Sequence, residues 1–144
     1  MMAVAMQKDL VSISIVTFNH AHCVQSALES ALRQTHRDIE IIVVDNASTD
    51  GTRELLARFE NRITVVLNET NTGFCAAHNE AIRRGRGEFV LVMNPDIVLE
   101  PDYVANAVEA MRREGRIGTI AGFLMTRAEE GREVVDSAGL GFDR

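Results

Sequence analysis

Four short apolar runs alternate with helical segments, and this alternation limits the fold more than any other feature of the chain. The runs are rich in β-branched residues and cover residues 11–18, 39–44, 63–67 and 89–93. Three of them are apolar at nearly every position, which indicates strands buried on both faces, as in a parallel sheet flanked by helices. Strand and helix in repeated succession predict an α/β domain with a Rossmann-like, doubly wound, mostly parallel sheet.

The segments between the runs have helical periodicity. In the first of them Val24, Ala27, Leu28 and Ala31 recur at the spacing of one helix face. The helices are expected at residues 22–34, 52–59, 76–84 and 102–113. A fifth strand is expected over residues 117–123, followed by an incomplete element at 134–139.

Length and composition favour one globular domain. The chain has 144 residues, of which 46% are hydrophobic and 25% charged, which is enough for a core and carries no signature of disorder. Residues 1–10 are too polar for an export signal or a membrane span, so we expect a flexible leader there and the folded domain at 11–144. Cys23 and Cys75 lack metal-ligand spacing, which favours reduced thiols in a cytoplasmic protein. The net charge of −6 disfavours nucleic acid as a partner.

Polar side chains follow three of the predicted strands at the point where each strand ends. Thr17 closes the first strand, Asp45 closes the second, and Asn94 and Asp96 follow the fourth. Because the carboxyl ends of parallel strands share one edge of a sheet, we expect these side chains to line one crevice. A carboxylate such as Asp96 at that edge suits a divalent cation, which in turn neutralises a diphosphate.

Each of these features has a purely structural alternative. Thr17 is also a common strand-end residue whose hydroxyl caps a backbone group, and residues 45–50 suit a turn followed by a helix cap. Residues 94–96 suit a turn, because Asn, Pro and Asp all favour turns. A dinucleotide-binding dehydrogenase is disfavoured, since residues 18–22 lack the glycines that admit a pyrophosphate.

Taken together, four motifs resemble those of the family two inverting glycosyltransferases, in that family's order and approximate spacing. They are VTFN at 16–19, VVDNASTDGT at 43–52, the segment from NTGF to Asn79 at 71–79, and NPD at 94–96. The resemblance implies a GT-A fold, a nucleoside-diphosphate sugar as donor, and a divalent metal, Mg²⁺ or Mn²⁺. The NPD sequence, in place of the more usual Asp-x-Asp, resembles the rhamnosyltransferase-like branch and implies rhamnose as the sugar.

The resemblance also implies roles for individual residues. Thr17 and Asp45 would contact the pyrimidine and its ribose, and Asp96 would bind the metal that bridges the diphosphate. Asn94 stands where the usual motif has its first acid, so the metal site has one negative charge fewer. The remaining positions that the resemblance places at the donor are Asn19, Asn46, Gly73 and Asn79.

The family's catalytic base lies in the half of the domain that follows the metal motif, and that half also builds the acceptor site. We therefore expect this chain to be the amino-terminal, nucleotide-binding half of a GT-A domain, and we assign no base. The implied acceptor is a polysaccharide or lipid-linked saccharide, reached from the cytoplasm at the inner face of the membrane. The alternative is a truncated, noncatalytic module that binds nucleotide or forms a homo-oligomer through apolar surface at residues 117–123 and 134–142.

Overall fold

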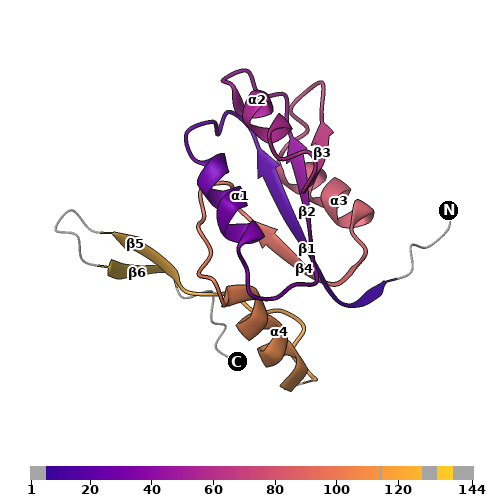
Figure 1. Ribbon diagram of the computed structural model, residues 1–144, viewed down its shortest axis with the longest axis vertical. Coiled ribbons are helices and arrows are strands. Elements are labelled where there is room, and N and C mark those ends of the chain that lie inside the picture. Colours follow the sequence, from indigo (N-terminus) through magenta and orange to yellow (C-terminus); the bar gives the residue numbers. More distant parts are fainter. Residues whose placement is uncertain (1–5, 114, 128–132, 138–144) are drawn as a thin grey trace. The chain divides into compact units, whose positions relative to one another are not determined.

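A four-stranded parallel sheet forms the centre of the first of two compact units. The computed structural model describes residues 6–113, 115–127 and 133–137. The strands are β1 (Gln7–Thr17), β2 (Ile39–Asp45), β3 (Thr64–Leu67) and β4 (Gly87–Met93), in the order β3-β2-β1-β4 (Figure 1). All three ladders are parallel, as the four apolar runs predict.

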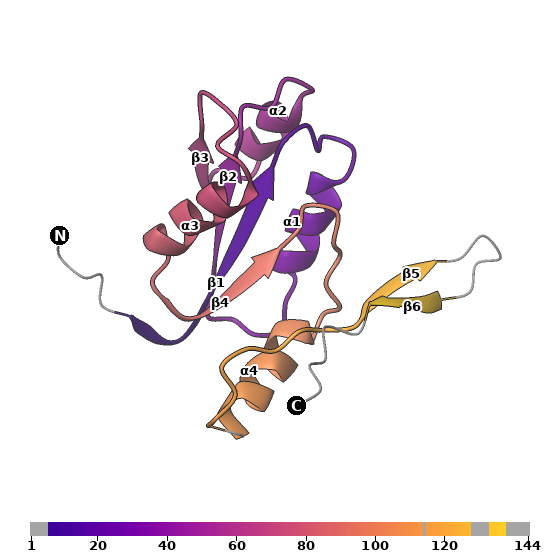
Figure 2. The ribbon, with the colours of Figure 1, turned by 180° about the vertical axis from the view of Figure 1, so that it is seen from behind.

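Helices cover both faces of this sheet. They are α1 (Val24–Leu32), α2 (Thr52–Ala57), α3 (Phe74–Arg84) and α4 (Tyr103–Arg113). Helices α1 and α3 lie on opposite sides of the sheet in both ribbon views (Figure 1, Figure 2). The doubly wound α/β fold is therefore confirmed, and each of the four helices lies within two residues of its predicted bounds.

Alternate residues of the central strands supply two separate cores. On one face Ile13 and Ile15 of β1 are completely buried against α1, α2 and α4. On the other face Val16 and the β2 residues pack against Ala77 and Ala81, whose small side chains let α3 approach the sheet closely. Each fully buried Val or Ile stabilises the fold by roughly 1.5–3 kcal/mol, so burial on both faces fixes the strand register.

The predicted leader is partly wrong, because β1 begins at Gln7 and not at residue 11. The Gln7 N–H donates to the Arg86 carbonyl at 2.7 Å, and Leu10 is already buried. Backbone pairing with the start of β4 holds residues 7–10 in the strand although their side chains are mostly polar. Residues 1–5 lie outside the described residues.

Residues 109–144 form a second compact unit, where the predicted fifth strand is wrong. Residues 117–123 have no regular secondary structure. The strands of this unit are β5 (Leu124–Arg127) and β6 (Glu133–Ser137), which pair antiparallel. The glycines of the predicted segment, Gly118 and Gly122, lose the most backbone entropy in a strand. Of the apolar segment predicted at 134–142, residues 138–142 lie outside the described residues.

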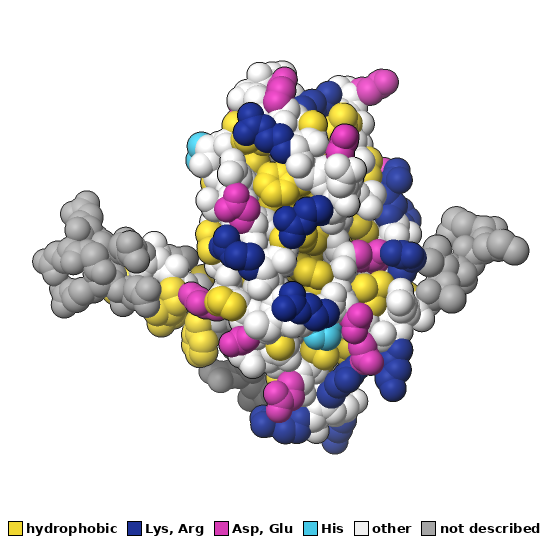
Figure 3. Space-filling model, viewed as in Figure 1, with side chains coloured by type: hydrophobic (Ala, Val, Ile, Leu, Met, Phe, Trp, Pro, Cys, Tyr) yellow, Lys and Arg dark blue, Asp and Glu magenta, His cyan; other side chains and the backbone are white. Residues whose placement is uncertain are grey.

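Charged side chains of both signs are interspersed on the surface. On the face shown in Figure 3, Lys and Arg side chains alternate with Asp and Glu and do not gather into a basic patch. Two arginines near the end of α3 are engaged in ion pairs, Arg84 with Glu80 and Arg86 with Glu40. Among the described residues, no helix combines the length and the apolar character needed to cross a bilayer.

Candidate functional site

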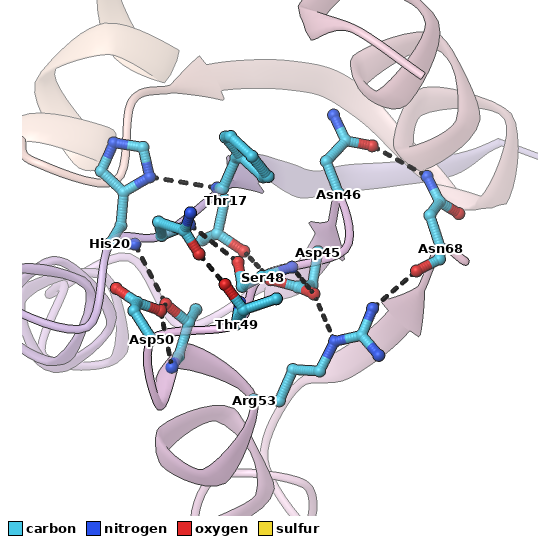
Figure 4. A network of polar contacts seen from close by, with 12 residues as sticks. Thr17, His20, Asp45, Asn46, Ser48, Thr49, Asp50, Arg53 and Asn68 are labelled. Carbon is cyan, nitrogen blue, oxygen red and sulfur yellow. Dashed lines mark hydrogen bonds and ion pairs between the residues drawn. The ribbon is translucent and has the colours of Figure 1, made fainter. Parts of the chain in front are cut away.

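The ends of β1 and β2 are joined by hydrogen bonds between residues that the sequence places far apart. The Thr17 hydroxyl donates to Asp45 Oδ1 at 3.0 Å, and the Asn46 N–H donates to the Thr17 carbonyl at 2.8 Å (Figure 4). Thr17 and Asp45 are both completely buried. The structure thus brings these two predicted site residues together and makes them one unit.

The second oxygen of Asp45 is also bound. Its Oδ2 accepts from the Ser48 N–H at 3.0 Å and from Arg53 Nε at 2.7 Å. Burial raises the pKa of Asp45, but the hydrogen bonds from Ser48, Arg53 and Thr17 outweigh burial and hold that pKa below its usual value. Asp45 is therefore an ionised carboxylate at neutral pH, with three donors around it.

Asn19 links the loop after β1 to the loop after β2. Its backbone N–H donates to Ser48 Oγ at 2.9 Å, and its Oδ1 accepts from the Thr49 N–H at 2.8 Å. Asn19 has a φ of 58°, a left-handed conformation that Asn adopts more readily than most residues. Ala47 has a φ of 66° in the neighbouring loop, which is strained for a residue with a β-carbon. The two loops are thus held together in an uncommon backbone conformation.

Asn46 connects the end of β2 to the segment that enters α3. Its Oδ1 accepts from Asn68 Nδ2 at 3.0 Å and from the Thr72 hydroxyl at 3.1 Å, and its Nδ2 donates to the Gly73 carbonyl at 3.3 Å. Gly73 has a φ of 85°, which accounts for a glycine at the start of this helix. The structure thus brings together Asn46 and Gly73, two residues that the resemblance places at the donor.

The segment after β4 presents Asn94 and Asp96 to solvent, while Pro95 between them is buried. Ser30 of α1 and Gln34 just after that helix anchor this segment, and neither residue belongs to a motif that predicts a function. The Leu99 N–H donates to Ser30 Oγ at 3.0 Å, and Gln34 Nε2 donates to the Glu100 carbonyl at 2.8 Å. Gln34 is a polar residue that is buried two residues after the end of α1. Its sequence signal is its place at the end of the apolar helical stripe that begins at Val24.

Asp96 follows β4, which pairs in parallel with β1, so its segment leaves the sheet at the same edge as the loops after β1 and β2. Burial raises the pKa of Cys23, and the negative charges of Asp96 and Asp50 raise it further. Asp50 belongs to the loop after β2, where it accepts from the Ala21 N–H and the Thr52 hydroxyl. The loops after β1, β2 and β4 therefore converge at one edge of the sheet, as the sequence predicts.

The donor set at this edge suits a cation that is completed by a ligand. No group of three or more His, Cys, Asp or Glu side chains in the described part of the chain has a metal-binding arrangement. Mg²⁺ sites commonly use one or two carboxylates together with water and substrate phosphates, and Mn²⁺ accepts similar oxygen ligands. The exposed carboxylate of Asp96 and the amide of Asn94 fit such a site.

Two further residues of α3 lie outside this hydrogen-bonded cluster. Asn79 is exposed on the helix, and no hydrogen bond among the described residues joins it to the strand-end loops. His78 is buried, and its Nδ1 lies 2.8 Å from the Ser14 hydroxyl. His78 therefore packs against the sheet, whereas the donor role of Asn79 stays a prediction.

A match to a protein family covers most of the chain. Residues 12–139 match the model of glycosyl transferase family 2. TuaG of Bacillus subtilis, described as a glycosyltransferase of teichuronic acid biosynthesis, is 33% identical over 119 residues, which are 81% of this chain and 47% of TuaG. The Escherichia coli enzyme WfaP, a UDP-Glc:alpha-D-GlcNAc-diphosphoundecaprenol beta-1,3-glucosyltransferase, is 31% identical over 107 residues, 74% of this chain and 43% of WfaP. The chain thus spans less than half the length of these two relatives.

Solved structures agree with the fold. The mannosyltransferase PcManGT of Pyrobaculum calidifontis, in complex with GDP-Man and Mn²⁺, matches with a TM-score of 0.68 and 29% identity over 73% of this chain and 33% of PcManGT. TarS of S. aureus, in complex with UDP-GlcNAc, matches with a TM-score of 0.68 and 27% identity over 72% of this chain and 31% of the TarS chain. The fold is that of the GT-A glycosyltransferases, and the chain belongs to glycosyl transferase family 2.

Proposed function

We propose that the protein binds a nucleoside-diphosphate sugar and forms the donor-binding part of a glycosyltransferase. That enzyme transfers the sugar from the bound donor. The observation that carries this proposal is the convergence of the Thr17–Asp45–Asn46 cluster and Asp96 on one edge of the sheet. Two relatives with this fold are known in complex with GDP-Man and with UDP-GlcNAc, which supports a donor of that class.

The order of the strands supports a placement for the two ends of the donor. The nucleoside would lie over β1 and β2, near Thr17, Asn19 and the Asn46–Gly73 link, and Asn79 would extend this side along α3. Asp45 already accepts three hydrogen bonds and is completely buried, so it would act on the nucleoside through the groups that it positions. The diphosphate would then lie toward β4, where Asn94 and Asp96 are exposed.

Asp96 would hold Mg²⁺ or Mn²⁺ together with the phosphate oxygens of the donor. A bound cation supplies Lewis-acid stabilisation of the negative charge that develops on the leaving nucleoside diphosphate. Asn94 contributes a neutral oxygen ligand, so the protein brings a single negative charge to the cation. The negative charge of Asp45 would contribute little to binding the cation, because Asp45 is already paired with Arg53.

For the finer chemistry we propose an inverting transfer of a deoxyhexose such as rhamnose to a polysaccharide or lipid-linked acceptor. The NPD sequence at 94–96 supports the sugar, and the diphosphoundecaprenol in the name of WfaP supports a lipid-linked acceptor. No catalytic base is assigned among the residues described here.

The test is the variant Asp96→Ala, with Glu100→Ala in the same exposed segment as its control. UDP, dTDP and GDP are titrated by calorimetry with and without Mn²⁺ against both variants and the wild type. We expect Asp96→Ala to lose the metal-dependent gain in affinity and to keep the wild-type melting temperature, because an exposed carboxylate adds little to the core. The same Mn²⁺ dependence in Asp96→Ala and in the wild type would contradict the metal assignment.

A further inference from the structure

Arg53 contacts the buried carboxylate of Asp45 from a position that helix formation does not favour. It is the second residue of α2, where the positive end of the helix dipole disfavours a cation. Its Nε nevertheless donates to Asp45 Oδ2 at 2.7 Å, and its Nη2 donates to the Asn68 carbonyl at 2.6 Å. Arg53 thus bridges the ends of β2 and β3 (Figure 4).

The two contacts fix the guanidinium without using all of its donors. The Nη1 group makes no hydrogen bond within the described part of the chain, and the side chain is 37% exposed. Asp45, in contrast, has no exposed surface left. Of this ion pair, only Arg53 can therefore touch a ligand in this conformation, and a guanidinium can only donate hydrogen bonds.

The place of Arg53 in the sheet decides which part of a donor it would meet. Strands β2 and β4 are two ladder spacings apart, about 10 Å, and β3 is one spacing further from β4. Arg53 lies at the β2 and β3 ends, whereas Asp96 follows β4. A diphosphate held at Asp96 would place the nucleoside, and not the phosphates, toward Arg53.

We infer that Arg53 is a specificity-determining residue that recognises a nucleobase with a carbonyl oxygen at C4 of a pyrimidine or C6 of a purine, namely uracil, thymine or guanine. This inference rests on the proposed function. The fixed N–H groups of Arg53 can donate to a carbonyl oxygen. The exocyclic amino group of adenine is itself a donor, so two donors would face each other and no hydrogen bond would form. Asp45 and Asn68 act as positioning residues, because they hold the guanidinium in place.

The test compares Arg53→Gln and Arg53→Lys with the wild type. The control is Arg58→Gln, the same change at an exposed residue at the end of α2. Calorimetry without metal measures the affinity for UMP, dTMP, GMP and AMP, which lack the diphosphate and so do not depend on Asp96. Circular dichroism and thermal melting report the fold of every variant.

We expect the wild type to bind at least one of UMP, dTMP and GMP about tenfold or more tightly than AMP. Arg53→Gln should lose about tenfold or more of that affinity and leave AMP unchanged, since it removes charge-assisted hydrogen bonds. Arg53→Lys should fall between the two, because it keeps the charge and loses the planar fork. Arg58→Gln should behave as the wild type.

Three outcomes overturn the inference and leave the proposed function standing. They are equal affinity of the wild type for AMP and the preferred nucleotide, wild-type affinity in Arg53→Gln, and an equal loss for all four nucleotides, which would show a structural role only. If Arg53→Gln does not fold, the test uses Arg53→Lys and compares its affinity for the preferred nucleotide with its affinity for AMP. A wild type that binds neither these nucleotides nor UDP, dTDP or GDP with Mn²⁺ overturns the proposed function and the inference with it.

Discussion

At the scale of single residues, the part of the site at the ends of β1 and β2 is built from buried, hydrogen-bonded polar side chains, Thr17, Asp45 and Asn46. Asp45 has donors on both oxygens, and Asn46 accepts from two side chains while donating to a backbone carbonyl. Buried polar networks stabilise a single geometry when every member is bonded, and are costly when one member is removed. The same residues that position a nucleotide should therefore also stabilise the domain.

Asp45→Asn tests this double role. The amide has a single acceptor oxygen, so it cannot accept from Thr17 on one side and from Ser48 and Arg53 on the other, and it lacks the charge that pairs with Arg53. We therefore expect the free energy of unfolding at pH 7 to fall by about 1.5–3 kcal/mol. The folded-state pKa of Asp45 is lowered, so the stability that its carboxylate provides is present above the unfolded pKa, about 4, and is lost as the pH falls through the folded pKa. The gap between wild type and variant should then narrow below about pH 4.

Urea unfolding at a series of pH values measures this difference. Asp38→Asn, at an exposed residue before β2, is the matched control and should change stability little at any pH. A constant difference between Asp45→Asn and the wild type down to acid pH would show that the charge of Asp45 does not stabilise the fold.

At the scale of elements, helix α1 and the residues just after it anchor the segment that carries Asp96. Gln34 is buried, donates to the Glu100 carbonyl, and accepts from the Val104 N–H at 2.9 Å at the start of α4. Ser30 holds Leu99 in the same way. The segment that contains Asp96 is therefore held by residues far from it in sequence. The bonds go to the backbone of residues 99–104, so they do not depend on which side chains that segment carries.

Gln34→Ala should separate the two ends of the proposed donor site. The variant leaves the buried Val104 N–H unpaired, at about 1–3 kcal/mol, and removes one of the two hydrogen bonds to the Glu100 carbonyl. We expect a lower melting temperature and a weaker Mn²⁺-dependent gain for UDP, because Asp96 loses its fixed place, while metal-free UMP affinity stays as in the wild type. The control is Gln25→Ala on the exposed face of α1, and calorimetry measures both affinities. Loss of UMP affinity by the same factor would contradict a role confined to the β4 side.

At the scale of the whole molecule, β4 is the last strand of the four-stranded sheet among the described residues, and apolar side chains on one of its faces are exposed. On the side of α3, Val90 and Val92 are 43% and 49% exposed, whereas Val16 and Val44 on the same face are buried beneath α3. Exposed edge strands with apolar side chains are prone to pair with other chains. This feature favours self-association of the 144-residue chain. The sequence predicts self-association too, but through residues 117–123 and 134–142.

Val92→Lys is predicted to reduce this self-association, because a charged side chain on an edge strand opposes pairing. Light scattering over a range of protein concentrations measures the average mass of the wild type and the variant. Val98→Lys, at a valine that is 61% exposed and outside the sheet, is the control and should leave the mass unchanged. A monomeric wild type at all concentrations would show that the edge of β4 does not associate.

The sequence alone determined the α/β fold, the four parallel strands and the residues that meet at their carboxyl ends. This was possible because burial on both faces leaves a near-continuous apolar signature, and because parallel topology brings strand ends to one edge. Tertiary structure decided the rest: the start of β1 at Gln7, the absence of a strand over residues 117–123, and the contacts of Arg53 and Gln34. These depend on backbone pairing and on polar bonds between distant segments, and such bonds leave no periodic pattern in the sequence.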